Sequence, residues 1–122
     1  MVSVYLCDDV PELRHLIRVI LEEDEHLCVV GEAGDAETGI EEIAELQPNV
    51  VVLDLSMPGM DGLEALPVIQ RTAPETKVIV FSGFTEERMA ALALAEGAAR
   101  YIEKGEPIEN VRQAGRELAA AA

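Results

Sequence analysis

The chain has 122 residues, 49% of them hydrophobic, a length and composition that indicate one globular domain over residues 1–122 and exclude disorder as its main state. Its 24 acidic residues outnumber the 9 basic ones and give a formal net charge of −15, and the excess is concentrated in residues 1–49, with 13 acids and 2 bases. Such a charge repels phosphate backbones and anionic lipid headgroups, so we expect no direct binding of nucleic acid or of a membrane by this domain.

The first apolar run, Val2–Cys7, predicts a strand, and a helix is expected after it. Pro11 suits the first turn of that helix. Five apolar residues at helical spacing are expected to share one face: Leu13, Leu16, Ile17, Ile20 and Leu21. The acidic run from Glu22 to Glu25 at the end of this helix is interpreted as a solvated face.

The second strand is predicted at Leu27–Gly31, and it leads to a helix with Asp35 as its N-cap. This helix is expected to place four side chains inward: Ala36, Ile40, Ile43 and Ala44. Pro48 forbids continuation, so the helix must end before that residue.

The third strand is predicted at Val50–Asp54, and the helix after it begins near Asp61. Pro67 lies inside this helix and has no main-chain N–H to donate. We therefore expect a kink or a delayed start in the third helix.

Two further strand and helix pairs complete the chain. A strand at Lys77–Phe81 precedes a helix over about Thr85–Glu96 that closes at Gly97. A last strand at Ala99–Ile102 precedes a helix that starts at Pro107 and directs three side chains toward the core: Ile108, Val111 and Leu118.

Five strand-then-helix units with short connections predict an α/β fold, namely one doubly wound, five-stranded parallel sheet with helices on both faces. The predicted strands are short and apolar, as expected for strands that are buried on both faces. Reactive groups in such a sheet gather beyond the carboxyl ends of the strands. A functional site is therefore expected at that edge of the sheet.

Cysteine and histidine usage points to a reducing compartment and to no special chemistry. Cys7 and Cys28 each lie in an apolar run, which favours buried thiols over a disulfide. His15 and His26 lie away from the strand ends and are expected on the surface. No basic region precedes the first strand and no apolar run approaches the roughly 20 residues of a membrane span, so we expect no signal peptide and a cytoplasmic location.

Polar side chains follow four of the predicted strands at the same edge of the sheet: Asp8 and Asp9, Asp54, Ser82, and Glu103 with Lys104. Three carboxylates that converge repel one another strongly unless a cation intervenes. Oxygen ligands without a nearby His or Cys favour a hard ion, and an incomplete protein shell that leaves room for water and phosphate oxygens favours Mg²⁺. We therefore predict a magnesium site at the strand-end acids.

Four segments at these strand ends resemble the receiver domain of bacterial two-component response regulators: the pair Asp8-Asp9, the segment Leu53-Asp54-Leu55-Ser56-Met57-Pro58-Gly59-Met60-Asp61-Gly62, Ser82 with Gly83, and the stretch from Glu96 to Lys104. The resemblance covers the whole chain and implies a flavodoxin-like sheet with strand order 2-1-3-4-5. Gly105 follows Lys104 where one large branch of the family has Pro, which is more similar to regulators with a LuxR-type helix-turn-helix output domain.

The resemblance also implies the ligands of the metal and the acceptor. Asp54 would be the phosphoacceptor, and the Mg²⁺ shell would consist of Asp8, Asp9, Asp54 and the main-chain carbonyl of Ser56. Phosphoryl transfer to a carboxylate needs an in-line nucleophile and a divalent ion that bridges oxygens, which agrees with these roles.

Three further roles carry over in the same way. Lys104 would pair with the incoming phosphoryl group, and Ser82 would hydrogen-bond one of its oxygens. Tyr101 resembles the aromatic residue that swings inward when that serine moves.

The function implied by the resemblance is a signalling switch and not an enzyme. A sensor histidine kinase would donate a phosphoryl group to Asp54, and the surface of the fourth helix, fifth strand and fifth helix would then change partners, with a homodimer as one outcome. The chain ends in four alanines without an output domain, so we expect either a stand-alone receiver or a receiver separated from a DNA-binding output domain.

Three other function classes share parts of this pattern. A magnesium-dependent phosphatase of the haloacid dehalogenase type has a second Asp two residues after the nucleophile, where this chain has Ser56. A flavin or nucleotide carrier needs a phosphate-binding loop after the first strand, where Asp8-Asp9-Val10-Pro11 is anionic. A receiver-like scaffold that works unphosphorylated stays open, although such proteins usually lack one of the site residues.

The lifetime of the phosphorylated state depends, by analogy with the family, on Ser56 and Phe84. These two residues would border the path of the water that hydrolyses the aspartyl phosphate. Neither carries a carboxylate or an amide that could orient this water, so slow self-dephosphorylation is expected. The alternative is that Phe84 points away as an interface residue.

Overall fold

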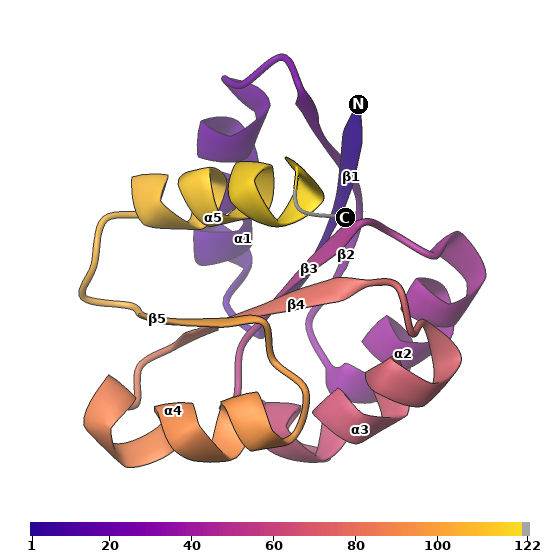
Figure 1. The fold of residues 1–122 in the computed structure, drawn as a ribbon, viewed down its shortest axis with the longest axis vertical. Coiled ribbons are helices and arrows are strands. Elements are labelled where there is room, and N and C mark those ends of the chain that lie inside the picture. The colour runs from indigo at the N-terminus through magenta and orange to yellow at the C-terminus, as the bar shows by residue number, and fades with distance from the viewer. Residues whose placement is uncertain (121–122) are drawn as a thin grey trace.

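A computed structural model describes residues 1–120, in which five strands and five helices alternate (Figure 1). The strands are β1 (Val2–Cys7), β2 (Leu27–Ala33), β3 (Val50–Leu53), β4 (Lys77–Ser82) and β5 (Arg100–Glu103). The helices are α1 (Pro11–Glu22), α2 (Ala36–Leu46), α3 (Gly62–Thr72), α4 (Glu86–Ala95) and α5 (Glu109–Ala120). All the strand pairs are parallel and the strand order is 2-1-3-4-5, which confirms the predicted sheet.

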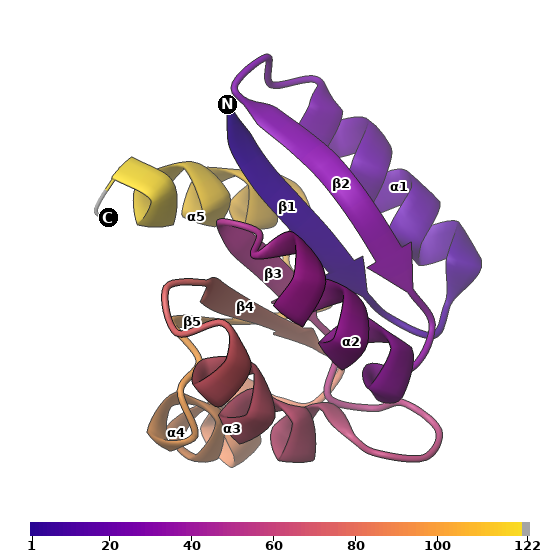
Figure 2. The same ribbon diagram turned by 90° about the vertical axis from the view of Figure 1, so that its right-hand side faces the viewer.

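Helices cover both faces of the sheet: α1 and α5 lie on one side, and α2, α3 and α4 on the other (Figures 1 and 2). Successive strand residues alternate between the two cores. Tyr5, Val51 and Val80 pack under α2 and α3, for example, whereas Leu6 and Val52 pack under α1 and α5. The sheet therefore separates two apolar layers and leaves its carboxyl edge free for polar groups.

The expectation of strands buried on both faces holds for the three central strands and is wrong for the edges. β2 lies at one edge, where Val30 is exposed and Cys28 is only half-buried, whereas Cys7 in β1 is buried. β2 also continues to Ala33, beyond its predicted end at Gly31, because Cys7 of β1 pairs with Ala33. Both cysteines are free thiols.

Caps set the ends of α2 and α3 as the sequence predicts. The Asp35 carboxylate accepts the Thr38 N–H at 2.8 Å, and the Asp61 carboxylate accepts the Glu64 N–H at 2.8 Å. α3 begins directly after Asp61, so the delayed start expected from Pro67 does not occur, and Pro67 lies within a continuous helix.

Predictions for the other helices need three corrections. Leu16 of α1 is exposed, because the face buried against the sheet is centred on Ile17 and Leu21. α4 begins at Glu86 and α5 at Glu109, later than the predicted Thr85 and Pro107. The last two residues of the four-alanine ending lie outside the described residues.

The acidic run after α1 is also not a uniform solvated face. The Asp24 side chain is only 5% exposed and accepts hydrogen bonds from Arg112 at 2.7 Å and Arg116 at 2.8 Å, both in α5. His26 lies at the surface as expected, with Nδ1 at 3.2 Å from the same carboxylate. In residues 1–120 no helix has both the length and the apolar character needed to cross a bilayer.

Candidate functional site

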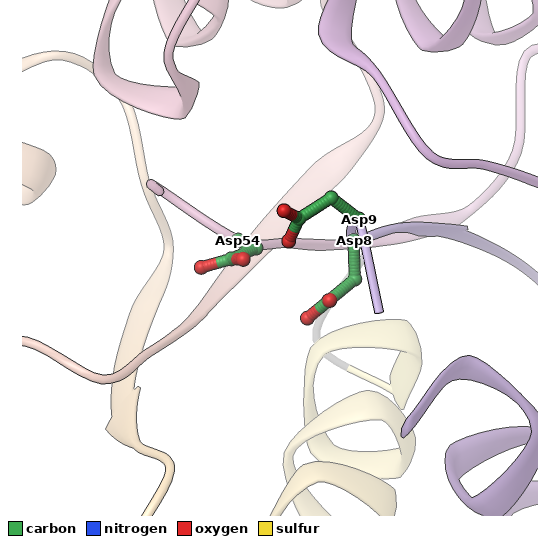
Figure 3. Close-up of side chains that lie close together, drawn as sticks. All are labelled: Asp8, Asp9 and Asp54. Carbon is green, nitrogen blue, oxygen red and sulfur yellow. The ribbon is translucent and has the colours of Figure 1, made fainter. Parts of the chain in front are cut away.

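Adjacent strands bring the three predicted acidic residues to one edge of the sheet. The Asp8 N–H donates to the Ala33 carbonyl at 3.1 Å, and the Asp54 N–H donates to the Cys7 carbonyl at 2.9 Å, so both residues continue the ladder just past the strand ends. Asp9 follows Asp8 in the β1–α1 loop. Figure 3 shows the three side chains gathered at this point.

The carboxylates of Asp8, Asp9 and Asp54 each offer an oxygen, and these oxygens all lie within 4.8 Å of one another. Asp8 and Asp54 are 4% and 2% exposed, whereas Asp9 is exposed. Two buried like charges at this separation repel each other in surroundings that screen charge poorly. The cluster therefore favours a cation beside it.

Lys104 supplies one cation. Its Nζ lies 3.0 Å from Asp8 Oδ2 and 3.2 Å from Asp54 Oδ2. The residue follows β5, and its N–H donates to the Ser82 carbonyl at 2.7 Å, which places the lysine across from the end of β4. The structure thus brings Asp8, Asp9, Asp54 and Lys104 together.

Burial raises the pKa of Asp54, and the neighbouring Asp8 carboxylate raises it further. The Ser56 N–H, which donates to Asp54 Oδ1 at 3.1 Å, and the Lys104 ammonium group oppose this shift without cancelling it. Burial alone would lower the pKa of Lys104, but hydrogen bonds and charge from Asp8 and Asp54 raise it overall. The lysine therefore stays charged, while the Asp54 carboxylate is more basic than an ordinary aspartate.

The donor set fits a hard divalent cation. Carboxylate oxygens form the cluster, and one of them, on Asp9, faces solvent. Three carboxylates exceed the single positive charge that Lys104 brings. Mg²⁺ prefers such oxygen ligands and keeps part of its water shell, so the residues present fit it.

Ser82, at the end of β4, and Tyr101, in β5, are linked through Phe84. Ser82 is buried, and its Oγ accepts the Phe84 N–H at 3.1 Å. The Tyr101 hydroxyl donates to the Phe84 carbonyl at 2.8 Å. Ser82 and Tyr101 thus hold opposite sides of the same residue in the β4–α4 loop.

Gly62 allows the β3–α3 loop to lie close to Asp54. A Cβ at this position would lie 2.2 Å from the Asp54 carbonyl oxygen, so only glycine fits. Ser56 and Phe84 border a shallow depression of about 300 Å³, whose other lining residues are Leu55, Met57, Asp61, Leu63 and Met89. Phe84 is 38% exposed at the rim of this depression.

Sequence reasoning missed Arg14, and it placed Glu103 at this edge without its contact to α4. Arg14 Nη1 donates to the main-chain carbonyl of Asp8, and the Glu103 carboxylate accepts the Glu86 N–H at the start of α4. A basic residue close to the acidic pair indicated that Arg14 could contact this loop. Its contact with the main-chain carbonyl of Asp8 could not be predicted from the spacing of the residues.

A family model described as the response regulator receiver domain matches residues 4–116. The chain belongs to this family. The nitrate/nitrite response regulator NarL of Escherichia coli K12 is 36% identical over 118 residues, which cover 97% of this chain and 55% of that protein. Response regulator GacA of Pseudomonas aeruginosa is 37% identical over 120 residues, with 98% of this chain and 56% of that protein covered. The chain spans about half the length of these relatives.

Solved structures agree with the assignment to receiver domains. The receiver domain of the putative response regulator NarL from Mycobacterium tuberculosis superposes with a TM-score of 0.91 at 30% identity, covering 99% of this chain and 98% of that one. A LuxR-family response regulator from Aurantimonas gives a TM-score of 0.92 at 29% identity, covering 98% and 85%. The chain is thus a flavodoxin-like receiver domain of a two-component response regulator, similar to those of LuxR-type regulators.

Proposed function

We propose that this receiver domain is a phosphoacceptor switch in which Asp54 takes a phosphoryl group from a sensor histidine kinase. The observation that carries the proposal is the setting of Asp54. It is a buried carboxylate with raised pKa, 3.2 Å from the Lys104 ammonium group and clustered with two further acids. A carboxylate in this setting is a competent nucleophile with a cation beside it.

In the proposed transfer an Asp54 carboxylate oxygen forms a bond to phosphorus while the bond from phosphorus to the donor's imidazole nitrogen breaks. The electron pair of that bond goes to the departing nitrogen. Lys104 offsets charge on the phosphoryl oxygens, and its present bond to Asp54 exchanges for one to the phosphoryl group. Ser82 donates a hydrogen bond from its hydroxyl group to one of these oxygens, while its Oγ still accepts the Phe84 N–H.

We assign the metal-holding role to Asp8, Asp9, Asp54 and the main-chain carbonyl of Ser56. A bound Mg²⁺ would supply positive charge that offsets the negative charge of the reacting oxygens. Asp8 is already oriented for this role, because the Val10 N–H holds its Oδ1 at 2.9 Å and Lys104 holds its Oδ2.

The proposed output is a change of partners at the surface formed by α4, β5 and α5, with a homodimer as one possible state. The domain itself is proposed to act as a cytoplasmic switch without enzymatic turnover.

The relatives extend well beyond the matched region, which supports a further, DNA-binding output domain in the full regulator. A protein-glutamate methylesterase of Maricaulis maris is 39% identical over 103 residues, which cover 26% of its length. This relative favours the alternative that the output domain is an enzyme.

Intact-mass spectrometry after incubation with acetyl phosphate and Mg²⁺ tests the proposal. The parent protein should gain one phosphoryl group, Asp54→Asn should gain none, and Lys104→Met should gain it far more slowly. A parent protein that stays unmodified while Mg²⁺ is shown to bind would favour a scaffold that works unphosphorylated.

A further inference from the structure

The β1–α1 loop carries two of the three clustered acids, yet α1 begins without a capping side chain. Val10 occupies the N-cap position and makes no side-chain cap bond, and Pro11 at the first helical position has no N–H. Loops that lead into a helix are normally fixed by such caps. The acidic loop therefore depends on a different anchor.

Arg14, in the first turn of α1, reaches back to this loop. Its Nη1 donates to the main-chain carbonyl of Asp8, while its Nε donates to Glu32 Oε1 at 2.8 Å. The side chain is only 15% exposed. Gly34 leaves space for the guanidinium group, because a Cβ there would lie 3.2 Å from Nη1. The group is thus enclosed between the acidic loop and the end of β2.

Glu32 is itself held on both sides. Arg18, four residues further along α1, donates from Nη2 to Glu32 Oε2 at 2.7 Å. Hydrogen bonds from Arg14 and then Arg18 hold the pKa of Glu32 below its ordinary value, so this carboxylate remains charged. A charged, doubly bonded Glu32 restricts the Arg14 side chain to the orientation in which it meets Asp8.

We propose that Arg14, held by Glu32, is a positioning residue that fixes the main chain of the Asp8-Asp9 loop so that both carboxylates stay gathered with Asp54. The other bonds to Asp8 come from the sheet, from the next turn of the loop and from Lys104. Arg14 adds a side-chain bond that ties the Asp8 carbonyl to α1 and, through Glu32, to β2. The inference deepens the proposed function, because it rests on the magnesium site assigned there.

Arg14→Met and Arg18→Met form a matched pair. Each removes one positive charge and one ion pair with Glu32, but of the two arginines Arg14 is the one bonded to Asp8. Calorimetric titration with MgCl₂ should show about tenfold weaker binding for Arg14→Met, the typical effect of removing a partner behind a metal ligand. Arg18→Met should bind like the parent. Arg14→Lys keeps the positive charge but not the forked guanidinium geometry, so its magnesium affinity should lie between those of Arg14→Met and Arg18→Met. It replaces Arg14→Met in the comparison if that variant does not fold.

Amide hydrogen exchange in metal-free protein gives a second readout that does not require the metal site. The Val10 N–H, which is bonded to the Asp8 carboxylate, should exchange faster in Arg14→Met and at the parent rate in Arg18→Met. Equal weakening of Mg²⁺ binding in both variants, or none in Arg14→Met, would overturn the proposal. If the parent bound no Mg²⁺, the proposed function would fail, and unchanged Val10 exchange in Arg14→Met would overturn the anchoring as well.

Discussion

Asp54 is charged in a place where burial and a neighbouring carboxylate both oppose the charge. A raised pKa means that ionising Asp54 costs more free energy in the folded protein than in the unfolded chain. This cost lowers the stability of the protein at neutral pH, and it disappears as the pH falls through the raised pKa and Asp54 is protonated. The Lys104 ammonium group offsets part of this free-energy cost. A bound divalent cation or a phosphoryl group on Asp54 would change the remaining part. Asp54 therefore resembles residues of other functional sites, where stability is given up for reactivity.

The contribution of Asp9 to metal binding is tested by Asp9→Ala. We expect magnesium affinity to fall by about tenfold or more, since one of three clustered carboxylates is lost. Glu12→Ala is the matched control, because Glu12 is an exposed acid at the start of α1 and its loss changes the net charge equally. Equal Mg²⁺ affinities for Asp9→Ala and the parent in a calorimetric titration would show that the assigned shell is wrong.

Phe84 is predicted to slow hydrolysis of the aspartyl phosphate. It borders the same depression as Ser56, and neither side chain can orient water as a carboxylate does. Phe84→Glu should therefore speed phosphoryl loss by about tenfold or more in the presence of Mg²⁺, whereas Phe84→Leu should decay like the parent. A decay in Phe84→Glu that is unchanged or slower would show that Phe84 does not guard the site.

Individual residues of the site could be predicted from the sequence where they come directly after a strand. Asp8, Asp9, Asp54 and Lys104 meet because parallel strands bring their carboxyl ends to one edge. Asp24 was not predictable, since its partners in α5 lie 88 and 92 residues away and nothing in the local acidic run distinguishes it. The residues that hold a site in place leave weaker sequence patterns than those that form it.

At the scale of elements, β5 holds the β4–α4 loop at two points. Tyr101 donates to the Phe84 carbonyl at 2.8 Å, and the Glu103 carboxylate accepts the Glu86 N–H. The bond from the Glu86 N–H to Glu103 takes the place of an N-cap for α4, because the Thr85 side chain makes no capping hydrogen bond. A pull on Ser82 at the end of β4 is thus transmitted to β5 and to the start of α4.

Phosphorylation should move this loop and Tyr101 together. Ser82 can follow a phosphoryl oxygen only by pulling this loop inward, because its Oγ accepts the Phe84 N–H and the Phe84 carbonyl is bonded to Tyr101. Amide signals in a nuclear magnetic resonance spectrum should therefore shift at residues 83–88 and at Tyr101 on addition of acetyl phosphate and Mg²⁺. In Tyr101→Phe the loop signals should still shift while those of β5 respond less. Shifts confined to the residues next to Asp54 would contradict this coupling.

Element boundaries departed from prediction where tertiary contacts overrode local signals. β2 extends through Glu32 to Ala33 because β1 pairs with both residues, and Arg14 and Arg18 neutralise the Glu32 charge. α5 starts at Glu109 and not at Pro107 because Glu106 is engaged in the preceding turn, where its carboxylate accepts the Glu103 N–H at 3.0 Å. The caps at Asp35 and Asp61 were predictable because their partners lie three residues away.

At the scale of the whole molecule, Asp24 joins the α1–β2 turn to α5. The His26 N–H and the Arg116 and Arg112 guanidinium groups hold the pKa of this carboxyl below its ordinary value. A depressed pKa contributes stability above the unfolded value of about 3.9, and that contribution is lost as pH falls toward the folded value. The fifth helix, on the proposed output surface, is thus tied to the far end of the sheet by charge.

Asp24→Asn should lower the midpoint of thermal unfolding at pH 7, and the difference from the parent should shrink as pH falls below about 4. Glu25→Gln, at an exposed neighbour in the same run, should leave the midpoint nearly unchanged. Parent and Asp24→Asn curves that differ equally at pH 7 and pH 3 would show that the Asp24 charge does not stabilise α5.

The location of the phosphoryl group tests the central claim most directly. Borohydride reduces an aspartyl phosphate to homoserine, so peptide mass spectrometry after reaction with acetyl phosphate, Mg²⁺ and then borohydride marks the acceptor residue. We predict homoserine at residue 54 in the parent protein and none in Asp54→Asn. Homoserine at residue 8 or 9, or a phosphoryl group found on Ser82, would contradict the assignment of Asp54 as the phosphoacceptor.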